Sequence, residues 1–176
     1  RTPFSHTFGN NERYLEEKLS DVNDYERAKE IINNFKDREI YLIDLDHILN
    51  PDIDFLSLSK KLTELAELII SSAIKISEKL LTEKYGRPKT VAGIPATYAV
   101  FGLGKMGGAA LGYASDIELM FVYSDNGETE GPDRIPNNEF FERLFREAVS
   151  MIEAKRQGIF RVDLRLRPYG ASGPLA

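Results

Sequence analysis

Residues 102–118 read Gly-Leu-Gly-Lys-Met-Gly-Gly-Ala-Ala-Leu-Gly-Tyr-Ala-Ser-Asp-Ile-Glu, and this stretch decides the fold of the chain. A glycine-rich turn that carries a lysine is followed within a few residues by two carboxylates, Asp116 and Glu118. Backbone amides and a lysine suit phosphate groups, and paired carboxylates suit a divalent metal ion. The stretch therefore predicts chemistry on a nucleotide.

The segment 102–107 also matches the dinucleotide-binding fingerprint letter for letter. A predicted strand precedes it, and Asp125 lies near the position where a ribose-binding acid is expected. Two parallel strands, however, need a crossover of about a dozen residues or more, usually a helix. Nine residues, 108–116, precede the next predicted strand, which leaves room only for a short helical turn over residues 106–111. A nicotinamide-dependent dehydrogenase domain is therefore the less favoured interpretation.

The favoured interpretation places a phosphate group against the turn. Gly107 and Gly108 would begin a short helix whose backbone N–H groups face the phosphate. Lys105 and Ser115 are the candidates for a side chain that contacts the same phosphate.

Three carboxylates are the candidate metal ligands. Asp116 and Glu118 alternate along a predicted strand, so both project from the same face. Such a pair alone is typical of a solvated strand face, but Asp163 lies on the polar face of a second predicted strand. If the two strands are neighbours in one sheet, the three carboxylates converge and repel one another unless cations hold them. Two magnesium ions with oxygen ligands are the usual solution for phosphoryl chemistry.

Arginines surround the third carboxylate, at Arg161, Arg165 and Arg167. They suit either of two roles: solubilising charges on an edge strand, or bidentate ligands of phosphate oxygens beside the metal cluster. We expect Arg165 or Arg167 to contact the substrate.

Hydrophobic periodicity predicts an α+β protein, with helices in the first half and mainly strands in the second. The charges of the helical half are expected to form solvated faces. A division into a helical region, 1–90, and a core, 91–176, follows from the change of period. The expected elements are helices over 12–49, 54–85 and 138–157, strands over 98–101, 117–123 and 160–167, and a surface loop over 124–138.

Composition excludes several classes of protein. The 176 residues contain no cysteine, which excludes disulfides, thiolate zinc sites and cysteine nucleophiles. The net charge of −5 disfavours a nucleic-acid partner, and no apolar run approaches the length that spans a membrane, so a cytoplasmic location is expected. The missing initiator methionine and the end at Ala176 suggest a fragment of a longer chain.

Four motifs carry a family resemblance: residues 102–108, 114–119, 161–170 and 172–175. Together they closely resemble the glutamine synthetase adenylyltransferase family, which belongs to the polymerase-β-type nucleotidyltransferase superfamily. The resemblance is strongest over residues 98–176 and is looser over the preceding helices. It implies a mixed nucleotidyltransferase sheet with flanking helices, preceded by an N-terminal helical region.

The resemblance also implies a function. Members of this family have two modules, one that adds AMP from ATP to a tyrosine of glutamine synthetase and one that removes it by phosphorolysis, giving ADP. Both respond to a nitrogen-signalling regulatory protein and to glutamine. The arginine-rich segment here is more similar to the adenylyl-removing module.

The resemblance assigns site residues as well. It implies that Asp116, Glu118 and Asp163 bind magnesium, and that Gly107, Gly108 and Ser115 hold phosphate. The chain departs from the family pattern at Glu118, where aspartate is usual, and at residues 109–110, where two alanines replace a more polar pair. A non-catalytic module that keeps the fold and binds a nucleotide or a protein is the competing hypothesis.

Overall fold

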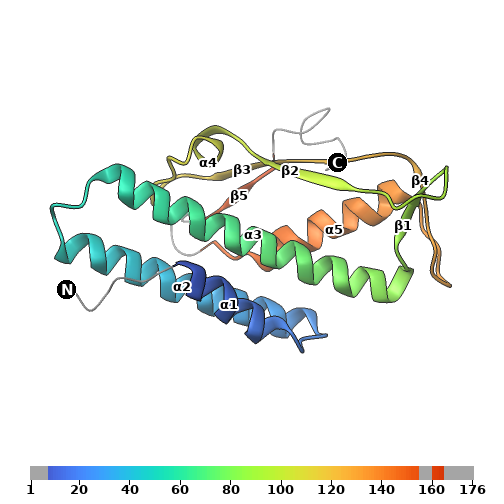
Figure 1. Ribbon diagram of the computed structural model, residues 1–176, viewed down its shortest axis with the longest axis horizontal. Helices are drawn as coiled ribbons and strands as arrows, with labels where there is room; N and C mark the ends of the chain where they lie inside the picture. Colours follow the sequence, from blue (N-terminus) through green and yellow to red (C-terminus); the bar gives the residue numbers. More distant parts are fainter. Residues whose placement is uncertain (1–7, 155–159, 165–176) are drawn as a thin grey trace.

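The structure, a computed structural model, describes residues 8–154 and 160–164, and its elements form three layers (Figure 1). Helices α1 and α2 form the first layer, α3 and α5 the second, and a three-stranded sheet the third. In chain order the elements are α1 (Phe8–Leu19), α2 (Tyr25–Leu49), α3 (Phe55–Tyr85), β1 (Pro88–Thr90), β2 (Tyr98–Gly102), α4 (Gly104–Gly107), β3 (Ile117–Tyr123), β4 (Gly127–Thr129), α5 (Asn137–Met151) and β5 (Val162–Asp163). The predicted α+β class is confirmed.

The expectation of a single helix over residues 12–49 is wrong, because the structure has two helices there, α1 and α2, separated by a short non-helical segment. Asp24 has an extended backbone, and its side chain accepts a hydrogen bond from the N–H of Arg27 at 2.8 Å, which starts a new helix. The helix expected over 54–85 is confirmed as α3. Asp54 caps its first turn, and Gly86, with a φ of 81°, follows its last residue.

The sheet has the strand order β2-β3-β5. Strand β2 pairs with β3 in antiparallel register, with Gly102 opposite Leu119, whereas β3 and β5 are parallel. A dinucleotide-binding unit needs parallel strands joined by a crossover helix. The antiparallel β2–β3 pair, joined through a four-residue helix, excludes that unit for residues 98–123. The strand predicted over 117–123 is confirmed, and the strand predicted over 98–101 extends by one residue.

The surface loop expected over 124–138 is wrong in part, because β4 pairs with β1 in a two-stranded antiparallel ribbon. Each of these strands has only three residues, which is too short for an alternating pattern to be visible. Close backbone contact allows the ribbon to form: a Cβ on Gly131 would overlap the backbone of Tyr85.

Helix α5 packs its aromatic face against the sheet. The rings of Phe145 and Phe121 stack with centroids 4.1 Å apart, and those of Phe141 and Tyr123 stack at 5.0 Å. The helix was expected to extend to residue 157, but it ends at Met151 and the backbone of Ile152 is extended. Helices α3 and α5 thus lie on the same side of the sheet in Figure 1.

Two further observations complete the fold. Of the strand expected over 160–167, the described residues include a strand at Val162–Asp163, and residues 165–167 lie outside them. Within the described part of the chain, no helix combines the length and the apolar character that crossing a membrane requires.

Candidate functional site

The register of β3 and β5 brings the three predicted carboxylates to one face of the sheet. Glu118 lies directly opposite Asp163 in the parallel pair, and Asp116 precedes Glu118 by two residues. Ile117 and Leu119, which alternate with these acids, are buried. Because successive side chains of a strand point to opposite faces, the acids occupy the face that α3 and α5 do not cover.

Asp116 is held by an arginine in this arrangement. Arg161, the residue before β5, donates from Nε to Oδ1 of Asp116 at 3.0 Å and from Nη2 to Oδ2 at 2.7 Å. This is the two-pronged geometry in which a guanidinium binds a carboxylate. Among the described residues, Arg161 is thus an arginine that contacts a predicted metal ligand; Arg165 and Arg167 lie outside them.

The donor set fits magnesium in its chemistry, because all three side chains offer carboxylate oxygens. The side chains as they stand do not form a ligand set: among residues 8–154 and 160–164, no three acidic or histidine side chains are grouped closely enough to hold a metal ion. The strand register thus brings the three carboxylates to the same region of the sheet. Their side chains would have to move closer together to bind one metal ion.

The glycine-rich turn lies against the second carboxylate. Helix α4 covers residues 104–107, so the helical turn expected over 106–111 begins earlier and is shorter. The expectation that Gly107 and Gly108 begin this helix is wrong, because they end it and their N–H groups donate to the carbonyls of Leu103 and Gly104. Gly104 has a φ of 52°, and a Cβ there would overlap Oε2 of Glu118. The N–H of Leu103 donates to the carbonyl of Glu118 at 2.9 Å. A side chain at residue 104 would therefore force the Glu118 carboxylate to move from this position.

Gly107 allows a second close approach within the turn. A Cβ on Gly107 would lie 2.5 Å from the carbonyl oxygen of Gly102, at the end of β2. The turn consequently packs directly on the ends of β2 and β3, beside the acidic face.

The remaining predicted phosphate ligands have different surroundings. Ser115 is buried, and its Oγ accepts a hydrogen bond from the N–H of Gly112 at 3.1 Å, which closes the turn before Asp116. Lys105 and Gly108 are exposed. Phosphate binding by these residues stays a prediction. Arg165 and Arg167 lie outside the described residues.

A cavity of about 440 Å³ adjoins the turn on the helix-covered side of the sheet. Its lining includes Gly102 and Gly107 from the turn region and Tyr98 from β2. The Tyr98 hydroxyl donates to Oε2 of Glu78 at 2.8 Å. Burial, together with the neighbouring Glu78 carboxylate, raises the pKa of Tyr98, so its hydroxyl stays protonated at neutral pH.

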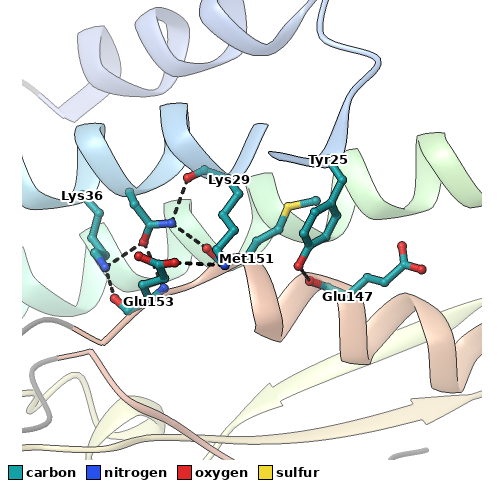
Figure 2. Close-up of polar contacts among 7 residues, drawn as sticks. Tyr25, Lys29, Lys36, Glu147, Met151 and Glu153 are labelled. Carbon is teal, nitrogen blue, oxygen red and sulfur yellow. Dashed lines mark hydrogen bonds and ion pairs between the residues drawn. The ribbon is translucent and has the colours of Figure 1, made fainter. Parts of the chain in front are cut away.

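Sequence reasoning missed a polar cluster between α2 and the end of α5 (Figure 2). The side chain of Asn33 donates to the carbonyl of Met151 at 2.7 Å and accepts from the N–H of Glu153 at 3.0 Å. Lys36, whose side chain is 1% exposed, donates to Oδ1 of Asn33 at 2.9 Å and to the Glu153 carbonyl. Lys29 pairs with the Glu153 carboxylate at 2.9 Å. We name these five residues the α2–α5 clamp.

The clamp corrects the expectation that charges of the helical half are solvated. Lys36 and Glu39 are both buried, and Glu39 accepts hydrogen bonds from Asn11 of α1 and from Arg38. The burial of Lys36 could have been predicted from its spacing. It follows the buried Ile32 by four residues and therefore lies on the same helix face. The clamp fixes the backbone just after α5, on the path to β5.

The chain is similar to known proteins over most of its length. The sequence profile of the family described as Glutamate-ammonia ligase adenylyltransferase matches residues 3–176. A protein of Burkholderia mallei is 44% identical over 126 residues, which is 69% of this chain and 14% of that protein. One of Shewanella oneidensis is 34% identical over 167 residues, which is 92% of this chain and 17% of that protein. Both are called bifunctional glutamine synthetase adenylyltransferase/adenylyl-removing enzyme.

A protein of Aromatoleum aromaticum with the same name is 38% identical over 135 residues, 73% of this chain and 14% of its own length. The chain thus spans roughly one seventh of the length of these relatives.

Proposed function

Because this chain belongs to the glutamate-ammonia ligase adenylyltransferase family, a family of nucleotidyltransferases, we propose that it is a nucleotidyl-transfer module acting on glutamine synthetase. The reaction is the phosphorolytic removal of AMP from a tyrosine of that protein, in preference to its addition. The direction rests on the resemblance of residues 161–170 to the adenylyl-removing module. Glutamine synthetase and a nitrogen-signalling regulatory protein are its proposed protein partners.

The observation that carries this proposal is the register of β3 and β5. In this register Glu118 lies opposite Asp163 and two residues after Asp116, on the sheet face away from α3 and α5, and Glu118 lies against the glycine-rich turn. Phosphoryl transfer depends mainly on positioning and on neutralising charge, and a face with three carboxylates beside a phosphate-binding turn suits both.

The proposed reaction balances as follows. An oxygen of inorganic phosphate attacks the phosphorus of the adenylyl group and forms the P–O–P bond of ADP. The bond from that phosphorus to the tyrosyl oxygen breaks, and the tyrosyl oxygen takes up a proton. Asp116, Glu118 and Asp163 would hold magnesium, which when bound activates the attacking oxygen and neutralises charge on the leaving group.

The other site residues would act on phosphate groups. Gly107 and Gly108, with Lys105 and Ser115, would hold the adenylyl phosphate. Arg165 and Arg167 would neutralise phosphate oxygens, since a guanidinium binds them with two parallel hydrogen bonds.

A second candidate function is a module that binds a nucleotide or a protein without turnover. One observation favours it: both Asp116 oxygens are engaged by Arg161, in a site where Glu118 also replaces the usual aspartate. The two functions differ in whether ADP is released.

The test incubates the chain with adenylylated glutamine synthetase, inorganic phosphate and Mg²⁺, and measures ADP release. Release that is lost in Asp116→Asn and Asp163→Asn, but kept in the control Asp133→Asn, supports the proposed activity; Asp133 is an exposed aspartate of the loop before α5. Nucleotide binding in calorimetry without ADP release selects the second candidate. AMP incorporation from ATP, without ADP release, would reverse the proposed direction.

A further inference from the structure

The ion pair between Arg161 and Asp116 is the basis of an inference that rests on the proposed function. We propose that Arg161 takes the place of the metal ion: its guanidinium occupies Asp116 until a divalent cation displaces it. Loading of the site is then a competition between an arginine of the chain and the incoming ion.

The two groups compete for the same atoms. Arg161 donates to Oδ1 of Asp116 at 3.0 Å and to Oδ2 at 2.7 Å, so both oxygens of the carboxylate are engaged. A divalent ion binds a carboxylate through these same oxygens. The positive charge of the guanidinium at these oxygens therefore opposes the approach of a second cation.

The backbone keeps Arg161 at this position. The N–H of Ile117 donates to the Arg161 carbonyl at 2.8 Å, which fixes the arginine beside the residue that follows Asp116. The preceding residue, Phe160, is buried and has a φ of 59°, a left-handed conformation that is uncommon for a bulky side chain. The buried Phe160 thus fixes the backbone so that Arg161 lies next to Asp116.

The carboxylates of this face put negative charge close together. Asp116, Glu118 and Asp163 lie on one face at adjacent positions, and like charges so placed disfavour one another. The Arg161 guanidinium brings positive charge to this face when no metal ion does.

Exposure makes the contact reversible. The Arg161 side chain is 58% exposed and that of Asp116 is 29% exposed. Ion pairs that water reaches contribute little to stability and exchange readily. A buried pair would block the site, whereas this pair only lowers its affinity for the metal.

The test measures binding of Mn²⁺ to the chain, without substrate, from the loss of the electron paramagnetic resonance signal of the free ion. Arg161→Gln should bind Mn²⁺ about two- to fivefold more tightly than wild type, the range that corresponds to an exposed ion pair. Arg161→Lys, which keeps the charge but not the fork, should lie between the two. The control Arg134→Gln removes an arginine from an exposed pair with Glu128 and should leave the affinity unchanged.

A double variant shows whether the gain acts through Asp116. In the Asp116→Asn background, the change Arg161→Gln should give no tighter binding than Asp116→Asn alone. If the gain persists there, or if Arg161→Gln equals wild type or binds more weakly, the competition is overturned. Thermal unfolding of each variant confirms that it is folded.

Failure of this inference differs from failure of the proposed function. Wild type that binds Mn²⁺ with no gain in Arg161→Gln overturns the competition alone. Absence of Mn²⁺ binding in every variant overturns the metal site together with the competition, and ADP release then shows whether the activity survives without it.

Discussion

Asn33 in α2 donates a hydrogen bond to the carbonyl of Met151, the last residue of α5, across 118 positions of sequence. The same side chain accepts from the N–H of Glu153 at 3.0 Å. One amide group therefore ends one helix and fixes the chain that follows it, which explains why α5 stops at Met151 although its sequence continues in a helical pattern.

Replacing Asn33 should weaken the fold measurably. Asn33→Ala removes the hydrogen bonds of this side chain to Lys29, Met151 and Glu153. It also leaves the buried Lys36 without its Oδ1 partner, so we expect a loss of about 2–3 kcal/mol in the free energy of unfolding. Urea denaturation followed by circular dichroism gives this value. The matched control is Asn34→Ala, because Asn34 is the exposed neighbour on the same helix. Equal effects for the two would contradict a specific role of Asn33.

Lys36→Met tests the charge of the α2–α5 clamp separately from its volume. Methionine fills similar space but has no donor, so the Glu153 carbonyl and Oδ1 of Asn33 each lose a partner. We expect a loss of about 1–3 kcal/mol in the free energy of unfolding. The exposed Lys60 of α3 provides the control Lys60→Met, which should change stability by less than about 0.5 kcal/mol. If Lys36→Met left the free energy of unfolding unchanged, packing alone would hold the clamp together.

Gly104→Ala should affect the carboxylate more than the fold. A positive φ costs an alanine about 1 kcal/mol, and Glu118, whose carboxylate is the flexible end of its side chain, must move away from the added methyl group. Mn²⁺ affinity should then fall about tenfold, as for other groups that orient a metal ligand. Gly93→Ala is a close control, because Gly93 also has a positive φ, 79°, but no atom within 4 Å of an added Cβ. It should cost similar stability and leave Mn²⁺ binding intact.

Shortening Glu118 should relieve this conflict. In a Glu118→Asp background the carboxylate is one methylene shorter and no longer reaches Gly104, so Gly104→Ala should cost little further Mn²⁺ affinity. A full tenfold loss in that background would show that the alanine acts through the turn and not through Glu118.

Glu147→Gln should stabilise the chain at neutral pH. Burial raises the pKa of Glu147, with Arg143 and Lys84 opposing the shift, so the folded state holds the proton more tightly than the unfolded state. The corresponding stability is complete below the unfolded pKa of about 4.3 and is lost as pH rises through the folded value. Glutamine stays neutral, so the free energy of unfolding of the variant should exceed that of wild type at pH 7 and match it near pH 3.5. Urea denaturation at the two pH values checks this.

The sequence predicted elements whose signals are local. Strand β3 alternates buried and less buried residues from Ile117 to Phe121, and α3 has an apolar stripe with an aspartate before its first turn. The break before Tyr25 was missed because apolar residues continue at helical spacing across it. Strands β1 and β4, with three residues each, depend on each other and on close glycine packing, which no local pattern contains.

The same distinction holds for the candidate site. Alternation along the chain predicted that Asp116 and Glu118 share a face, and the register places Asp163 directly opposite Glu118. The pairing of Arg161 with Asp116 was not predictable, because it depends on the exact register of two strands and on the backbone of Phe160. Lys36 was missed because a lysine in a helix is usually solvated, and its buried partners belong to α5 and the residues after it.

The parallel pairing of β3 with β5 also has a consequence for the order of folding. Arg161 and Asp116 are 45 positions apart. Helix α5 lies between β3 and β5 in the sequence, and the clamp connects the end of α5 to α2. Contacts this distant in sequence require chain closure before they contribute, so they form late. A chain that is still being synthesised therefore acquires its third carboxylate only after α5 is complete, when β5 adds to the sheet.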